Sequence, residues 1–80
     1  MDIKIFEEVG WGHSKLAVVV DAALRKLGLN YKFEIIANPR FFPRYNIEIS
    51  PAITIDGKII LEGYEPSLNE MIKLLSKNLT

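Results

Sequence analysis

Cysteine is absent from this chain, and histidine occurs only once, at His13. Without cysteine there can be no disulfide, and without a Cys/His cluster the usual ligands of a structural metal are missing. We therefore expect neither a metal site nor a bound cofactor. Charge of one sign is also lacking, because ten basic and ten acidic residues give a formal net charge of zero. A neutral chain has no overall field to attract nucleic acid or an anionic membrane, so we expect neither as a partner.

Long apolar runs are missing too. No stretch approaches the roughly 18 consecutive apolar residues of a membrane span. Met1 leads directly into a strand-like segment, without the basic and apolar regions of a signal peptide, so we expect a cytoplasmic protein. The length suffices for one domain, residues 1–80, and is too short for two. A domain this small buries only about 60% of the surface of its unfolded chain, so it depends on an aliphatic core or on pairing with a second copy.

The first half of the chain predicts a strand, a helix and a second strand. Polar and apolar residues alternate over residues 2–7, which is typical of a strand. After a glycine-rich break at residues 10–14, apolar residues at helical spacing predict a helix over residues 16–27, with Gly28 as its C-cap. Residues 31–37 predict the second strand. Short connections of this kind imply a parallel pair joined by a right-handed crossover.

The second half predicts a hairpin. Asp56-Gly57 supplies the positive φ angles of a tight turn between antiparallel strands at residues 51–55 and 58–61. Before the hairpin, residues 39–46 leave room for a loop with one or two helical turns, because a proline cannot sit deep inside an α-helix.

A closing helix completes the chain. Ser67 and Glu70 form a capping box, and apolar residues over 68–79 give the helix one apolar face. The predicted order is therefore β-α-β-(α)-β-β-α. It indicates an α/β fold with a four-stranded mixed sheet and helices on its faces.

Several short motifs occur in this order along the chain. They are Ile3-Lys4-Ile5-Phe6, Leu27-Gly28, Ser50-Pro51, the run from Pro51 to Lys58, Gly63 and Pro66-Ser67. Over essentially the whole chain, this set resembles the small thioredoxin- and glutaredoxin-like redox proteins. The resemblance implies a thioredoxin-like fold in which Pro51 is a cis-proline that faces the active site.

The chain departs from that family at the redox motif. The Cys-x-x-Cys of the family falls on Gly10-Trp11-Gly12-His13. The first cysteine of such a motif reacts as a thiolate, which the helix N-terminus stabilises, and exchange proceeds through a mixed disulfide. With neither sulfur present, thiol–disulfide oxidoreductase activity is excluded, and we expect a binding module rather than an enzyme.

The groove beside Pro51 is the first candidate site. In the family, an extended peptide adds a short strand beside the residue before this proline. Losing the cysteines does not remove the groove. The residues expected to line it are Gly10, Trp11, Gly12, His13, Ile49, Ser50 and Pro51.

Trp11 and His13 each allow two interpretations. Trp11 could anchor a partner or fold down over the sheet edge, since the flanking glycines permit either. His13 could act as a general base near a helix start, with Glu7, Glu8 and Ser14 close in sequence. No triad spacing is recognisable, so we favour a His13 that begins the helix without chemistry.

Two further segments could form an interface. Val18 and Ala22 widen the apolar surface of the first helix, so this helix is expected either to be covered on both flanks or to contact a second copy. Aromatic residues at Phe41, Phe42 and Tyr45 alternate with arginines, a pattern that can also bind nucleic acid. The zero net charge disfavours nucleic acid, so we expect one of the phenylalanines in the core and a solvated pair of arginines.

Three functions stay open. The first is a redox-inactive module that binds an extended peptide or protein segment. The second is an enzyme or carrier for glutathione or another thiol ligand, as in the glutathione transferases, whose additional helical domain is missing here. The third is a structural or assembly subunit. We rank them in that order.

Overall fold

The structure is a computed structural model that describes residues 1–8 and 14–79. Its elements are β1 (Ile3–Phe6), α1 (Lys15–Lys26), β2 (Phe33–Ile36), the 3₁₀-helix η1 (Pro39–Tyr45), β3 (Ala52–Ile55), β4 (Lys58–Glu62) and α2 (Leu68–Leu79). The order confirms the prediction from the sequence. The strands differ from their predicted bounds by one or two residues at their ends.

A mixed four-stranded sheet with the order β2-β1-β3-β4 lies at the centre of the fold. β1 pairs parallel to β2 and antiparallel to β3, and β3 pairs antiparallel to β4. The α/β class and the mixed sheet are therefore as predicted. The hairpin turn also matches, because Asp56 and Gly57 have φ values of 51° and 84°.

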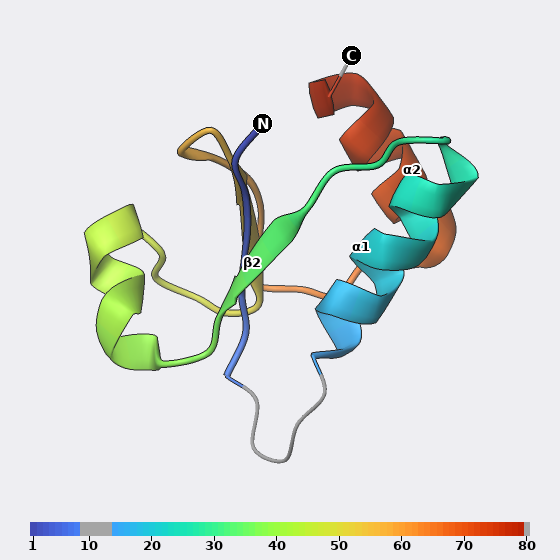
Figure 1. The fold of residues 1–80 in the computed structure, drawn as a ribbon. Helices are drawn as coiled ribbons and strands as arrows, with labels where there is room; N and C mark the ends of the chain where they lie inside the picture. Colours follow the sequence, from blue (N-terminus) through green and yellow to red (C-terminus); the bar gives the residue numbers. More distant parts are fainter. Residues whose placement is uncertain (9–13, 80) are drawn as a thin grey trace.

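The two faces of the sheet carry different layers (Figure 1). α1 and α2 cover one face, which we call the helical face. Its buried residues are Ile3, Ile5, Leu16, Ala17, Val20, Ala23, Leu24, Ile53, Ile55, Leu61, Met71, Leu75 and Leu79. η1 covers the other face, which we call the η1 face. Its smaller cluster consists of Phe6, Phe42, Ile47 and Ala52. Alternate strand residues supply the two clusters, as the two-residue period of a strand requires.

Both α-helices begin at a polar cap. The Ser14 hydroxyl accepts a hydrogen bond from the Ala17 amide at 3.0 Å and so satisfies a free N–H of α1. At α2, the Ser67 hydroxyl accepts from the Glu70 amide at 3.2 Å, and the Glu70 carboxylate accepts from the Ser67 amide at 3.3 Å. This reciprocal pair is the predicted capping box. In the described part of the chain, no helix has the length and apolar character to cross a membrane.

η1 shows how a proline-rich segment forms a helix. Asn38 caps it, with its side-chain oxygen accepting from the Arg40 amide at 3.0 Å, and Asn46 ends it at a φ of 62°. Hydrogen bonds in a 3₁₀-helix link residues three apart, and such helices are short. Pro43, which lacks an N–H, therefore lies inside η1 without interrupting a long series of helical hydrogen bonds. Of the two phenylalanines, Phe42 enters the core and its ring meets Phe6 edge-on at 5.7 Å between centroids.

Candidate functional site

Three segments meet at one end of the sheet. Phe6 at the end of β1 pairs with Ala52 at the start of β3, and Ala52 pairs with Glu62 at the end of β4. The residues that follow β1, precede β3 and follow β4 therefore share this end. α1 also begins here, as the chain trace in Figure 1 shows. We call this region the site end.

Glu62 fixes the segment that leads into Pro51. Its carboxylate oxygen Oε2 accepts from the Glu48 amide at 2.7 Å and from the Ile49 amide at 3.0 Å. These two hydrogen bonds favour the charged form and lower the pKa of Glu62 below its ordinary value. On the other side of the turn, the Gly63 amide donates to the Pro51 carbonyl at 2.8 Å. The Ser50–Pro51 peptide bond is cis.

Two large apolar side chains are exposed at the site end. Ile49 is 60% exposed and Tyr64 is 50% exposed. Ile49 lies against the backbone of Gly63, where a Cβ would stand 3.3 Å from Ile49 Cγ2. Gly63 has a φ of 90°, a backbone conformation that residues with a side chain rarely adopt. The described residues enclose no pocket.

Ser50 offers its main chain. The residue is exposed, and neither its N–H nor its C=O forms a hydrogen bond with a residue that the structure describes. Both neighbours of Ser50 form hydrogen bonds. The Ile49 amide donates to the Glu62 carboxylate, and the Pro51 carbonyl accepts from the Gly63 amide. An exposed and positioned peptide unit of this kind can pair with an extended chain.

Glu7 lies at the N-terminus of α1. Its Oε1 accepts from the Ser14 hydroxyl at 2.5 Å and from the Leu16 amide at 3.3 Å. A carboxylate in this position satisfies a free helical N–H and interacts favourably with the positive end of the helix. Glu7 therefore connects the end of β1 to the start of α1.

Glu65 joins this arrangement from the loop before α2. A hydrogen bond to the Glu7 carboxylate is open to Glu65 only when Glu65 carries a proton, and this favours the neutral form and raises the pKa of Glu65 above its ordinary value. Desolvation and the charge of Glu7 act in the same direction, while the ammonium group of Lys15 opposes them. Residues 1–8 and 14–79 contain no group of three or more His, Cys, Asp or Glu side chains that could hold an ion.

The structure brings some predicted site residues together. Ile49, Ser50 and Pro51 lie at the site end. Gly10, Trp11, Gly12 and His13 lie outside the described residues. Sequence reasoning missed the roles of Glu62 and Glu65. Neither belongs to a local motif, and their partners lie far away along the chain.

The predicted interface residues do not form one group. On α1, Val18 is 64% exposed and Ala22 is half-buried. On η1, Phe41 is exposed, and the Arg44 guanidinium carbon lies 5.1 Å from the centroid of its ring. Tyr45 is half-buried, and its ring contacts that of Phe6.

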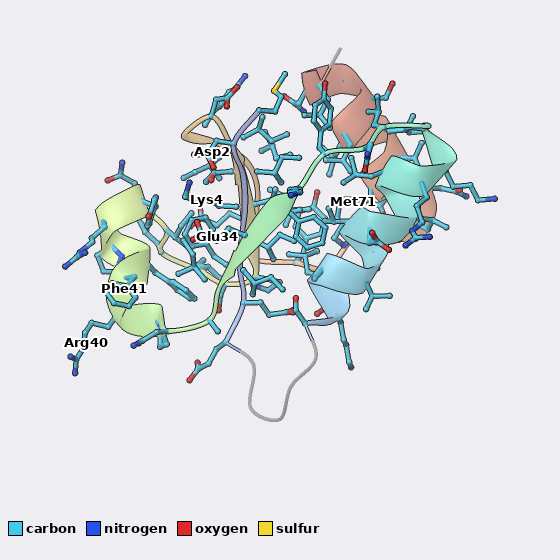
Figure 2. All side chains as sticks on the ribbon, in the orientation of Figure 1. Asp2, Lys4, Glu34, Arg40, Phe41 and Met71 are labelled. Atoms are coloured by element: carbon cyan, nitrogen blue, oxygen red, sulfur yellow. The ribbon has the colours of Figure 1, made fainter. Side chains whose placement is uncertain are left out.

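Phe42 must be removed from the candidate interface. It is only 7% exposed, because its ring fills the space between η1 and the sheet. The expectation that one phenylalanine enters the core is met by Phe42. Arg40 and Phe41 lie on the outer side of η1 (Figure 2).

Comparison with protein families gives a match to the family described as a thioredoxin domain, over residues 1–76. No curated protein matches the chain.

Proposed function

The chain belongs to the thioredoxin-domain family and contains no cysteine, and we propose that it binds an extended peptide or protein segment at Ile49, Ser50 and Pro51. It is a redox-inactive member, because disulfide exchange requires a thiolate that this chain cannot supply. The proposal concerns what the site end does in place of that reaction.

The main chain of Ser50 is the observation that carries the proposal. An extended ligand that adds a strand needs a donor and an acceptor that are not already used. The Ser50 groups meet this requirement within the described residues. Glu62 occupies the neighbouring Ile49 amide and holds the segment in place, so little ordering is needed when a ligand binds.

The surrounding side chains favour a ligand with apolar and basic residues. Ile49 and Tyr64 provide exposed apolar surface beside Ser50. Glu48 and Glu65 add exposed acidic residues at the same end of the sheet. Charge complementarity of this kind mainly sets partner choice and association rate.

An amide NMR titration of the labelled protein tests the proposal. The ligands are an extended peptide with alternating apolar and basic residues, a matched acidic peptide, and glutathione in a separate series. We expect saturable shifts at Ile49 and Ser50 with the basic peptide and weaker shifts with the acidic one. Ile49→Asp should abolish them, whereas Val18→Asp, an equal change at an exposed valine on α1, should not.

Two outcomes would overturn the proposal. If glutathione alone gives saturable shifts that include Gly63 and Tyr64, the site holds a thiol ligand instead. If no ligand shifts these amides at millimolar concentration, the site end does not bind extended peptides.

A further inference from the structure

The strand β2 forms one edge of the sheet, and half of its main-chain groups point outward. The Glu7 amide donates to the Ile36 carbonyl at 3.3 Å, so the groups of Ile36 point toward β1. Main-chain groups alternate in direction along a strand. Those of Phe33 and Ile35 therefore point away from β1, toward the open edge. An edge of this kind is a template for a further strand.

The side chains along this edge are complementary to those of a second copy related by a two-fold axis at Phe33. A second copy placed antiparallel, with a two-fold axis at Phe33, brings Lys32 opposite Glu34 of that copy, and the reverse. The same register places Tyr31 opposite Ile35, which is 42% exposed. In this register the outward groups of Phe33 meet their own counterparts, so main-chain and side-chain complementarity coincide.

Glu34 already lies on the side of the sheet where this contact would form. Its carboxylate is 3.8 Å from the ammonium group of Lys4 on the neighbouring strand, and Figure 2 shows the two side chains together. Lys32 directly precedes β2, and where the pairing extends the strand to it, the alternation of side chains places Lys32 on the same face as Glu34. An incoming lysine would therefore meet a carboxylate held close to its position in the free chain.

The opposite edge of the sheet is less suited to such pairing. β4 also begins with a lysine and ends with a glutamate, but its register with β3 shifts between Ile53 and Thr54. A bulge disturbs the regular spacing that a new strand needs and is one way in which edges are protected. The carboxylate of Glu62 is moreover occupied by the Glu48 and Ile49 amides.

We propose that two copies of this chain pair through β2, antiparallel about Phe33, and join their sheets into one continuous sheet. The pairing is independent of the site end and leaves Ile49 and Ser50 accessible on each copy. It would also bury apolar surface that a domain of this size leaves exposed.

Charge exchange at β2 tests this register. The mass in solution is measured by sedimentation across a range of concentrations for the unmodified chain, Lys32→Glu, Glu34→Lys and the double variant. Each single change places two like-charged pairs across the axis and should weaken the dimer by about tenfold or more. The double variant restores opposite charges and should restore the dimer. Lys58→Glu on β4 is the matched control and should leave the mass unchanged.

Amide exchange provides a readout that does not depend on the variants. In the dimer, the amides of Phe33 and Ile35 should become protected as concentration rises, while those of Glu34 and Ile36 are protected at every concentration. A monomer at all concentrations, with rapid exchange at Phe33 and Ile35, overturns the proposal. A dimer whose stability is unchanged by the substitutions at Lys32 and Glu34 also overturns the proposal, since a different surface then forms the contact.

Discussion

The two faces of the sheet differ in how they are held. On the helical face, α1 and α2 enclose a continuous aliphatic core. On the η1 face, a short helix rests on a small cluster in which Phe42 contacts Phe6. Buried apolar area is the main source of stability, so most of the folding free energy belongs to the helical face. The η1 face depends on few side chains and should open more easily.

The largest effect should follow from a cavity on the helical face. Leu75 on α2 is completely buried, and Leu75→Ala removes contacts that the surrounding residues cannot fully replace. We expect a loss of about 3 kcal/mol in the free energy of unfolding. Denaturant unfolding followed by circular dichroism measures it. A loss below about 1 kcal/mol would show that this face is not where stability resides.

A cavity on the η1 face should cost less. Phe42→Ala removes the buried ring of η1 that contacts Phe6, and we expect η1 to detach locally while the helices stay folded. We expect a loss of about 2 kcal/mol, below the roughly 3 to 5 kcal/mol of a fully buried phenylalanine. Amide exchange should show faster opening of η1 than of α2. If both open together at the same rate, the two faces form one cooperative unit and the comparison fails.

A single substitution on the η1 face should increase the free energy of unfolding. Thr54 lies on this side of β3, opposite Lys4, and its hydroxyl is buried with no hydrogen-bond partner among the described residues. Thr54→Val keeps the shape and removes the unpaired polar group, so we expect a gain of about 1 kcal/mol in the free energy of unfolding. Thermal unfolding of the variant measures this gain. A loss would mean that the hydroxyl is paired in solution.

The smallest effects should be pH-dependent and opposite in sign at two carboxyl groups. Glu62 holds the segment that follows η1, and its pKa is lowered by the Glu48 and Ile49 amides. A lowered pKa in the folded state contributes stability above the unfolded value, and this contribution is lost as the pH falls through the folded value. Glu62→Gln should therefore reduce the sensitivity to acid, as measured by denaturation midpoints at several pH values.

Glu65 should behave in the opposite way. Its pKa is raised, first by the hydrogen bond with Glu7. A raised pKa of an acid stabilises the folded state below the unfolded value, and this contribution is lost as the pH rises through the folded value. NMR titration of the side-chain carboxyl carbons should give Glu65 a higher midpoint than Glu62. The reverse order would contradict the geometry of both groups.

The sequence allowed some of these features to be predicted. The α-helices follow from apolar spacing and from the capping box at Ser67, and the hairpin follows from Asp56-Gly57. The predicted C-cap of α1 was one residue too late, because Leu27 is the cap and Gly28 follows it at a φ of 69°. Each of these signals depends on residues that are close together along the chain. The position of Ile49, Ser50 and Pro51 came from an ordered set of short motifs.

Other features depend on contacts that no local pattern encodes. The choice of Phe42 over Phe41 for the core depends on the orientation of η1 against the sheet. The hydrogen bond from the Ile49 amide to Glu62 links two segments that meet only after the hairpin has formed. The contact between Glu7 and Glu65 joins opposite ends of the chain. These contacts appear only once the topology is known.

The strand order has a consequence for how the chain folds during synthesis. β1 is made first, yet it occupies a central place and pairs with β2 on one side and β3 on the other. Until the ribosome has released β3, β1 has one open edge, and Ile53 and Ile55 of the helical-face core are missing. Contacts between such distant segments form slowly. We therefore expect the nascent chain to remain incomplete and prone to association until the hairpin emerges.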